Sequence, residues 1–249
     1  MSDQISLEAG ESYNGLDLSA FEFAERDLAG IRLTGCTLTD AQLSAVILQD
    51  GVFTDCRFVR CRFAHADLRE ARFVRCSFAD PQSHSGCDFA FCRLDEAVFE
   101  GCDLSFADID RSSLWSVRAS DTNLRGARFH KADFTRAFGP KVVRAAATFE
   151  RCSLELADLS DARLPGCSLK GSSLREADLT EADLEEADLT DCDLFQALTK
   201  GAKLAGADLR GAELSGLDLT QLGGFAGAKI TLAQQHLLLT AMGLDVYAD

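Results

Sequence analysis

The segment from Arg175 to Leu194 reads READLTEADLEEADLTDCDL. It holds four tandem copies of a five-residue unit that ends in Ala-Asp-Leu, with Cys192 replacing alanine in the fourth copy. A period of five matches neither the 3.6-residue period of an amphipathic helix nor the two-residue alternation of a strand. Repetition at a short fixed period is typical of a solenoid, in which each unit buries its apolar side chains against its neighbours.

We call the large apolar residue that ends each unit the centre, and the residue two positions before it the slot. Centres are leucine or phenylalanine from Phe23 to Phe78 and again from Phe149 to Leu194. If centre and slot point inward, a chain that turns after every unit closes one coil with every four units. Successive coils would then pair at the strand spacing of about 4.8 Å. The period therefore predicts an all-β solenoid.

The slots are small in the regular copies, which fits a narrow interior. In the first coil they are bulky or charged, which predicts an irregular capping coil. Every cysteine of the chain occupies a slot: Cys36, Cys56, Cys61, Cys76, Cys87, Cys92, Cys102, Cys152, Cys167 and Cys192. Disulfides or a metal site are alternatives, but no Cys-x-x-Cys is present, and we expect these thiols to fill the core of a cytoplasmic protein.

Two segments interrupt the period. After Phe78 the next centre is Phe89, eleven residues on rather than ten. Proline, serine and glycine residues between them predict a loop near 79–86, which we call loop 1. Candidate contact residues in loop 1 are Pro81, Gln82, Ser83, His84 and Ser85.

The second interruption, loop 2 (135–145), stays in register. Phe149 lies fifteen residues after Phe134, but Gly139 and Arg144 occupy centre positions that neither can fill. We therefore expect this segment to leave the wall of the solenoid. Candidate contact residues in loop 2 are Arg136, Phe138, Gly139, Pro140, Lys141, Val142, Val143 and Arg144.

The repeats end near Leu219, so we expect one repeat domain over 1–222 and a C-terminal segment over 223–249. Thr231 and Gln234 have the spacing of a capping box, and Gly243 is a natural C-cap, which predicts a helix between them. Its apolar side chains exceed what one coil end can cover, which favours a homodimer. The expected dimerisation residues are Leu232, Leu237, Leu238, Leu239, Met242, Leu244 and Val246.

The composition excludes several classes of protein. With 25 basic and 40 acidic residues the net charge is −15, which disfavours binding to nucleic acid or to an anionic membrane. We find no transmembrane run and no signal peptide, so we expect a soluble cytoplasmic protein. No catalytic or metal-binding motif occurs, and the four histidines are scattered, so we expect neither an enzyme nor a metal or cofactor.

The Ala-Asp-Leu units resemble those of the pentapeptide-repeat family, and the chain is most similar to its Qnr-type members. The narrower resemblance rests on loop 1, flanked by Cys-Ser-Phe and Gly-Cys-Asp-Phe, and on the segments CDLSFADI (102–109) and LRGARF (124–129). It also rests on loop 2 and on GAKITLAQQHLLLTAMGLDV (227–246). About thirty N-terminal residues precede the part of the chain that resembles Qnr-type proteins.

This resemblance implies a right-handed quadrilateral β-helix that dimerises through its C-terminal helix. It also implies an acidic rod that mimics DNA, binds DNA gyrase or topoisomerase IV, and protects the enzyme from quinolones. Loop 2 would be needed for protection, and loop 1 would assist. The extra N-terminal residues predict a longer rod at that tip.

Other interpretations remain open from the residues. The acidic surface can simply follow from aspartate being a good turn former in this repeat. The protein can be a scaffold with another partner, and the family resemblance equally allows a self-immunity factor against another topoisomerase poison. Trp115 directly follows centre Leu114 and is expected to face outward, where it is a candidate contact residue.

Overall fold

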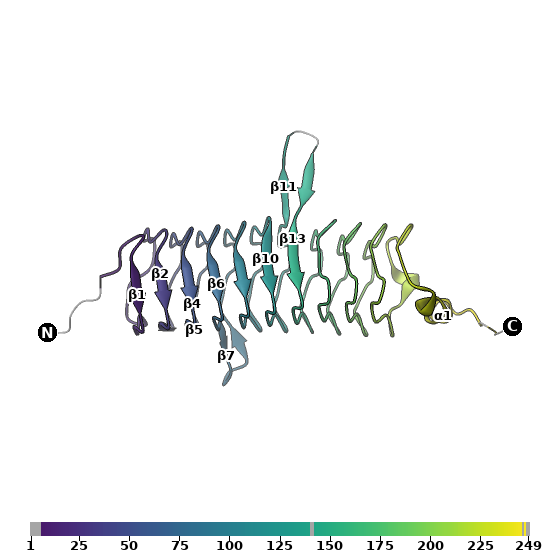
Figure 1. The fold of residues 1–249 in the computed structure, drawn as a ribbon, viewed down its shortest axis with the longest axis horizontal. Helices are drawn as coiled ribbons and strands as arrows, with labels where there is room; N and C mark the ends of the chain where they lie inside the picture. The colour runs from purple at the N-terminus through teal and green to yellow at the C-terminus, as the bar shows by residue number, and fades with distance from the viewer. Residues whose placement is uncertain (1–5, 140–141, 246, 248–249) are drawn as a thin grey trace.

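The computed structural model of the chain describes residues 6–139, 142–245 and 247, and it shows a straight rod of stacked coils (Figure 1). The N-terminal strand lies at one end of the rod and helix α1 (Leu232–Ala241) at the other. Two hairpins project from the middle of the rod in opposite directions (Figure 1). The solenoid expected from the period is therefore present.

The coils pair with one another as parallel strands. Strand β3 (Thr37–Thr39) pairs with β5 (Arg57–Val59) in a register that places Leu38 opposite Phe58, the equivalent centre four units later. A longer sheet runs along the rod through seven strands in the order β1 (Ser12–Asn14), β2 (Arg32–Thr34), β4 (Val52–Thr54), β6 (Arg72–Val74), β9 (Val98–Glu100), β10 (Val117–Ser120) and β13 (Ala147–Glu150). Isolated parallel bridges continue the pairing through the regular coils, so that four ladders run along the rod.

Each unit turns because its backbone hydrogen bonds are satisfied within the turn and by the next coil. The slot N–H of Ala187 donates to the carbonyl of centre Leu184 at 3.1 Å and closes the turn. Two residues after a centre the backbone enters the left-handed region, as at Asp50, where φ is 59°. That conformation costs energy for a residue other than glycine. The N–H of Asp50 donates to Arg69 O in the next coil at 3.0 Å, which helps to hold the turn.

Centres and slots form one continuous core, as expected. Leu184 and the flanking alanine slots have no exposed surface. Phenylalanine centres of successive coils stack: Phe53 lies 4.7 Å from Phe73, and Phe73 lies 5.0 Å from Phe99, between ring centroids. Phe58 stacks on Phe78 and Phe63 on Phe89 in the same way, because the four-unit coil places equivalent rings directly above one another.

Polar side chains in the slots bond to the preceding coil. Cys76 Sγ lies 3.4 Å from Phe53 O, and Ser112 Oγ donates to Phe89 O at 2.7 Å. Both bonds join a slot to the carbonyl of a centre in the coil before it. All ten cysteines are buried and free. The expected core-filling role is therefore confirmed, and a thiol or hydroxyl in the slot adds a hydrogen bond between coils that alanine cannot make.

The pairing extends beyond the last repeat of the sequence. After the 3-10 helix η1 (Leu219–Gln221), Gly224 still bridges to Lys203 and Lys229 to Asp208, so this last coil is one residue longer than the regular coils. Helix α1 then crosses the end of the rod. Gln234 Nε2 donates to Leu209 O at 2.7 Å and to Ala212 O at 2.8 Å, so hydrogen bonds join the helix to the end of the rod.

Candidate functional site

Both interruptions of the period leave the rod as antiparallel hairpins. Loop 1 contains β7 (Ala79–Asp80) paired with β8 (Ser85–Gly86), and loop 2 contains β11 (Thr135–Ala137) paired with β12 (Val143–Ala145). Each hairpin starts directly after a centre, where the other coils make a tight turn. The two insertion points are two of the four ladders apart, which agrees with the opposite directions of the hairpins (Figure 1).

The ladder pairing gives the size of each insertion. Across loop 1 the ladder pairs Arg62 with Asp88, so the loop adds six residues to a regular coil. The interpretation that the eleven residues from Phe78 to Phe89 are one more than two regular units was wrong. Phe89 takes the centre position directly after Phe78 and stacks on Phe63, so the spacing exceeds one regular unit by six residues. Across loop 2, strand β10 pairs with β13 with Ala119 opposite Phe149, which removes two whole units from the wall and confirms the expected excursion.

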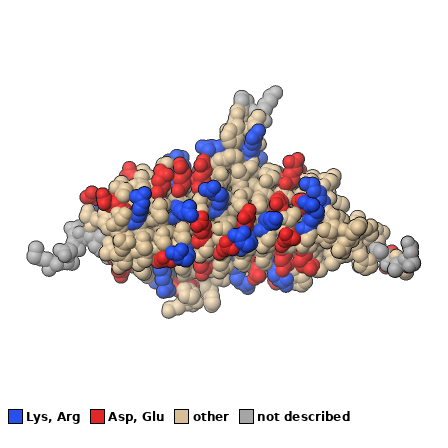
Figure 2. Space-filling model, in the orientation of Figure 1, with Lys and Arg blue, Asp and Glu red and all other residues tan. Residues whose placement is uncertain are grey.

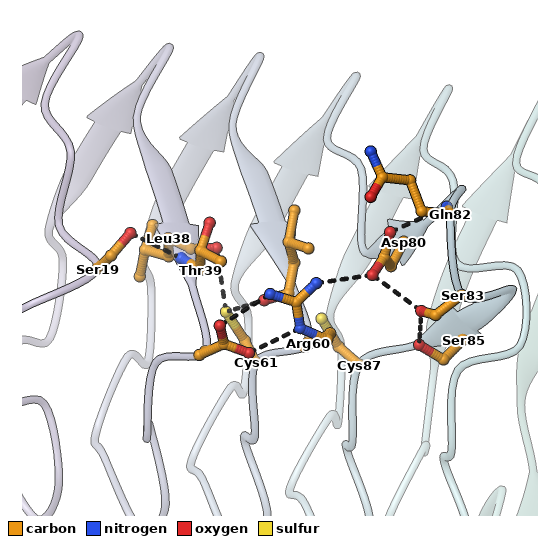
Figure 3. A network of polar contacts seen from close by, with 12 residues as sticks. Ser19, Leu38, Thr39, Arg60, Cys61, Asp80, Gln82, Ser83, Ser85 and Cys87 are labelled. Carbon is orange, nitrogen blue, oxygen red and sulfur yellow. Dashed lines mark hydrogen bonds and ion pairs between the residues drawn. The ribbon is translucent and has the colours of Figure 1, made fainter.

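A buried aspartate anchors loop 1. Asp80 is 5% exposed, and Arg60 of the preceding coil points toward it (Figure 3). Arg60 Nη1 donates to Asp80 Oδ2 at 2.8 Å and Arg60 Nε to Asp40 Oδ1 at 2.7 Å. The arginine therefore ties the start of the loop to the neighbouring coil.

Asp80 also organises the loop itself. Its carboxylate accepts hydrogen bonds from the Gln82 backbone N–H at 3.0 Å and from Ser83 Oγ at 2.8 Å, and Ser83 Oγ lies 2.7 Å from Ser85 Oγ (Figure 3). The Gln82 N–H, the Arg60 guanidinium and the Ser83 hydroxyl together lower the pKa of Asp80 to about 2. Ser83 and Ser85, predicted as contact residues, therefore also stabilise the loop.

The return strand of loop 1 presses against the following coil. A Cβ added to Gly86 would lie 2.3 Å from Ala107 N and 2.4 Å from the carbonyl carbon of Phe106. Both are backbone atoms, so only glycine fits at this position without displacing the loop. His84 lies over the same coil, with its ring 6.4 Å from the exposed ring of Phe106.

Loop 2 presents apolar and basic side chains. Phe138 N donates to Val142 O at 2.7 Å and continues the hairpin beyond its strands. Phe138, Val142 and Val143 are 56%, 44% and 55% exposed. Arg136, Gly139 and Arg144 are also exposed, whereas the predicted contact residues Pro140 and Lys141 lie outside the described residues.

Two contacts join loop 2 to the outer surface of the rod. The ring of Phe138 meets the Trp115 indole edge to face at 5.3 Å, and Arg136 Nη1 lies 3.5 Å from Glu96 Oε1. Trp115 lies on the outer surface, as expected, but it is half-buried because Phe138 of the hairpin packs against it. Nothing in the local sequence marks Glu96 or Asp80 as supports of the loops.

Charge is distributed unevenly along the rod, although acidic and basic side chains intermingle on the face in view (Figure 2). Five of the six arginines between Arg57 and Arg75 form ion pairs with carboxylates. The segment 176–193, beyond loop 2, has no lysine or arginine. Its nine acidic residues are Glu176, Asp178, Glu181, Asp183, Glu185, Glu186, Asp188, Asp191 and Asp193. The least compensated negative charge therefore lies between loop 2 and α1.

The C-terminal end carries an apolar groove of about 280 Å³ between α1 and the last coils. Leu238, Leu239 and Met242 line it from the helix side, and Leu237 packs against the core. Leu232 is 89% exposed and Leu244 is 51% exposed. Val246, the remaining predicted dimerisation residue, lies outside the described residues.

The part of the chain that the structure describes contains neither a metal-binding cluster nor a membrane-spanning helix. Within 6–139, 142–245 and 247, no group of three or more histidine, cysteine or acidic side chains could hold a metal ion. In the same ranges no helix is long and apolar enough to cross a membrane.

Comparison with known proteins identifies the repeat. A sequence model described as pentapeptide repeats matches eight copies, over 56–80, 85–114, 102–138, 152–191 and 187–221, which span more than half of the chain. The chain belongs to the pentapeptide-repeat family. No curated protein sequence matches it.

Solved structures of QnrB1, described as a plasmid-mediated fluoroquinolone resistance protein, have a similar fold. Two trypsin-treated QnrB1 variants are each 24% identical to this pentapeptide-repeat protein, with TM-scores of 0.72 and 0.70, and each match covers 98% of this chain and 100% of theirs. Full-length QnrB1 is 23% identical with a TM-score of 0.66, over 94% of this chain and 100% of its own. A match over 98% of the chain leaves no room for thirty unmatched N-terminal residues, so that expectation was wrong.

Proposed function

We propose that this protein binds DNA gyrase or topoisomerase IV and protects the enzyme from quinolone-like poisons, without catalysing a reaction. The observation that carries the proposal is a Qnr-like rod, matched over its full length, from which two anchored hairpins project. QnrB1 is described as a fluoroquinolone resistance protein. Loop 2, with exposed apolar and basic side chains on an acidic protein, is the main contact, and loop 1 assists.

We further propose that the acidic rod acts as a DNA mimic in the cytoplasm. In this proposal residues 1–222 form a right-handed quadrilateral β-helix, and the carboxylates of 176–193, of which Asp193 is paired with Arg175, face the basic DNA-binding surface of the enzyme. Residues 223–249 cap the rod and form a homodimer. The apolar groove beside α1 supports the dimer, because a second copy would cover the exposed Leu232, Met242 and Leu244.

The test is a supercoiling assay with purified gyrase, relaxed plasmid and a half-inhibitory concentration of ciprofloxacin. Supercoiling should return as the protein is added. Without drug, a large excess of protein should inhibit supercoiling, because a DNA mimic competes with the substrate. The proposal fails if the protein changes neither reaction for gyrase or for topoisomerase IV. Recovery of a different partner in a pull-down, with neither topoisomerase present, would favour the scaffold interpretation.

A further inference from the structure

Loop 2 is fixed to the rod mainly at its base. Strands β11 and β12 pair with each other in a two-stranded sheet of their own. At the base, Ala146 N donates to Phe134 O at 3.1 Å, and Ala146 O accepts from Ser116 N at 2.6 Å. An isolated two-stranded hairpin is marginal in water, so its direction depends on contacts beyond the base.

Trp115 lies beside this base and is itself held firmly. Its backbone N–H donates to Asp95 Oδ1 at 3.2 Å, and its carbonyl accepts from Glu96 N at 2.7 Å. The indole therefore belongs to the wall of the rod and not to the hairpin. It is half-buried, and its ring centroid lies 5.3 Å from that of Phe138, with the two ring planes at 62°.

The second contact of the hairpin is weaker. Arg136 and Glu96 are 55% and 50% exposed in their side chains, and the closest charged atoms are 3.5 Å apart. Exposed ion pairs of this kind contribute little. An edge-to-face aromatic pair changes the ratio of docked to undocked forms about twofold to tenfold. The aromatic contact is therefore the larger of the two.

We propose that Trp115 is a positioning residue for loop 2. Its indole is the platform on which Phe138 docks, and this contact sets the angle at which the hairpin meets the topoisomerase. The functional part of this inference rests on the proposed function, whereas the docking itself is a property of the free protein. Removing the platform leaves the rod intact but presents the same loop residues in a wider range of directions, which weakens binding.

The docking can be measured without a topoisomerase, because Trp115 is the single tryptophan of the chain. In the free, full-length protein, Phe138→Ala should shift the tryptophan emission to longer wavelength and increase its quenching by acrylamide. The matched control is Phe195→Ala, which removes a half-buried ring from a coil beyond loop 2 and should change neither signal. Unchanged emission and quenching in Phe138→Ala would overturn the docking.

The positioning role is measured in the ciprofloxacin assay. Trp115→Leu should raise the concentration of protein needed for half-maximal rescue by about twofold to tenfold, and Trp115→Phe, which keeps an aromatic ring, should stay close to wild type. Both variants should have the circular dichroism spectrum and melting temperature of the wild type. Equal rescue by wild type and Trp115→Leu would overturn the positioning role. If wild type itself gives no rescue, the proposed function fails, and the fluorescence result still decides the docking.

Discussion

Replacing Leu184 by alanine tests the packing of the rod at a place where little relaxation is available. Leu184 has no exposed surface, and the equivalent residues of the coils on either side, Leu164 and Leu204, are also buried leucines. Its backbone N–H donates to Lys203 O at 2.9 Å, which holds the coil in place after truncation. A buried leucine that becomes alanine costs about 2–5 kcal/mol, and a site that collapses poorly lies toward the upper end of this range.

That loss converts to a measurable shift in thermal unfolding. For a chain of this size, 1 kcal/mol corresponds to about 2–4 °C in melting temperature, so Leu184→Ala should melt about 4–20 °C below wild type. The matched control is the next residue, the exposed Glu185, whose replacement by alanine should change stability by no more than about 0.5 kcal/mol. Melting curves followed by circular dichroism compare the two variants. Equal melting temperatures would refute the assignment of inward and outward positions.

Three further predictions concern the loops and the C-terminal end. Gly86→Ala should displace loop 1 and cost about 1–3 kcal/mol in thermal unfolding, because its Cβ meets the Ala107 backbone; wild-type stability would contradict this close approach. The pKa of Asp80 is lowered to about 2, so loop 1 should be fully stabilised above about pH 4 and lose this contribution as the pH falls through 2. An NMR titration should place the Asp80 midpoint near 2 and find it higher in Arg60→Gln, and an ordinary midpoint in wild type would exclude the anchor. Met242→Asp should convert the proposed dimer to a monomer in analytical ultracentrifugation, whereas a wild-type monomer, or a dimer in the variant, would refute the C-terminal interface.

The core can be predicted from the sequence because the five-residue period indicates directly which side chains point into the rod. The burial of Leu184 and Ala187 can be predicted from the local sequence alone. One is large and the other small at the fixed spacing of the repeat, and both are buried. The position of every cysteine in a slot likewise predicts burial. The period does not predict the hydrogen bond from Cys76 to the carbonyl of Phe53, because this bond depends on how neighbouring coils are offset from each other in space.

The loops show where a sequence period stops being informative. The count from Phe78 to Phe89 gives the number of residues but not which earlier centre the second ring stacks on, and that stacking fixes the insertion at six residues. Trp115 is predicted to face outward because its neighbour Leu114 points inward, but the period does not predict that a hairpin covers it. Its partial burial depends on the direction of a hairpin that starts twenty residues later, for which no local pattern exists.

In the proposed function, a hairpin projecting from this rod protects a topoisomerase. Deleting residues 136–145 joins Thr135 to Ala146 and removes the two extra units between β10 and β13, so the ladder can close with a regular four-unit coil and no hairpin. The most direct measurement is the ciprofloxacin supercoiling assay with wild type and this deletion at matched concentrations. Wild type should rescue supercoiling, and a deletion variant that has the wild-type circular dichroism spectrum should not. Equal rescue by the folded deletion variant would contradict the proposed function.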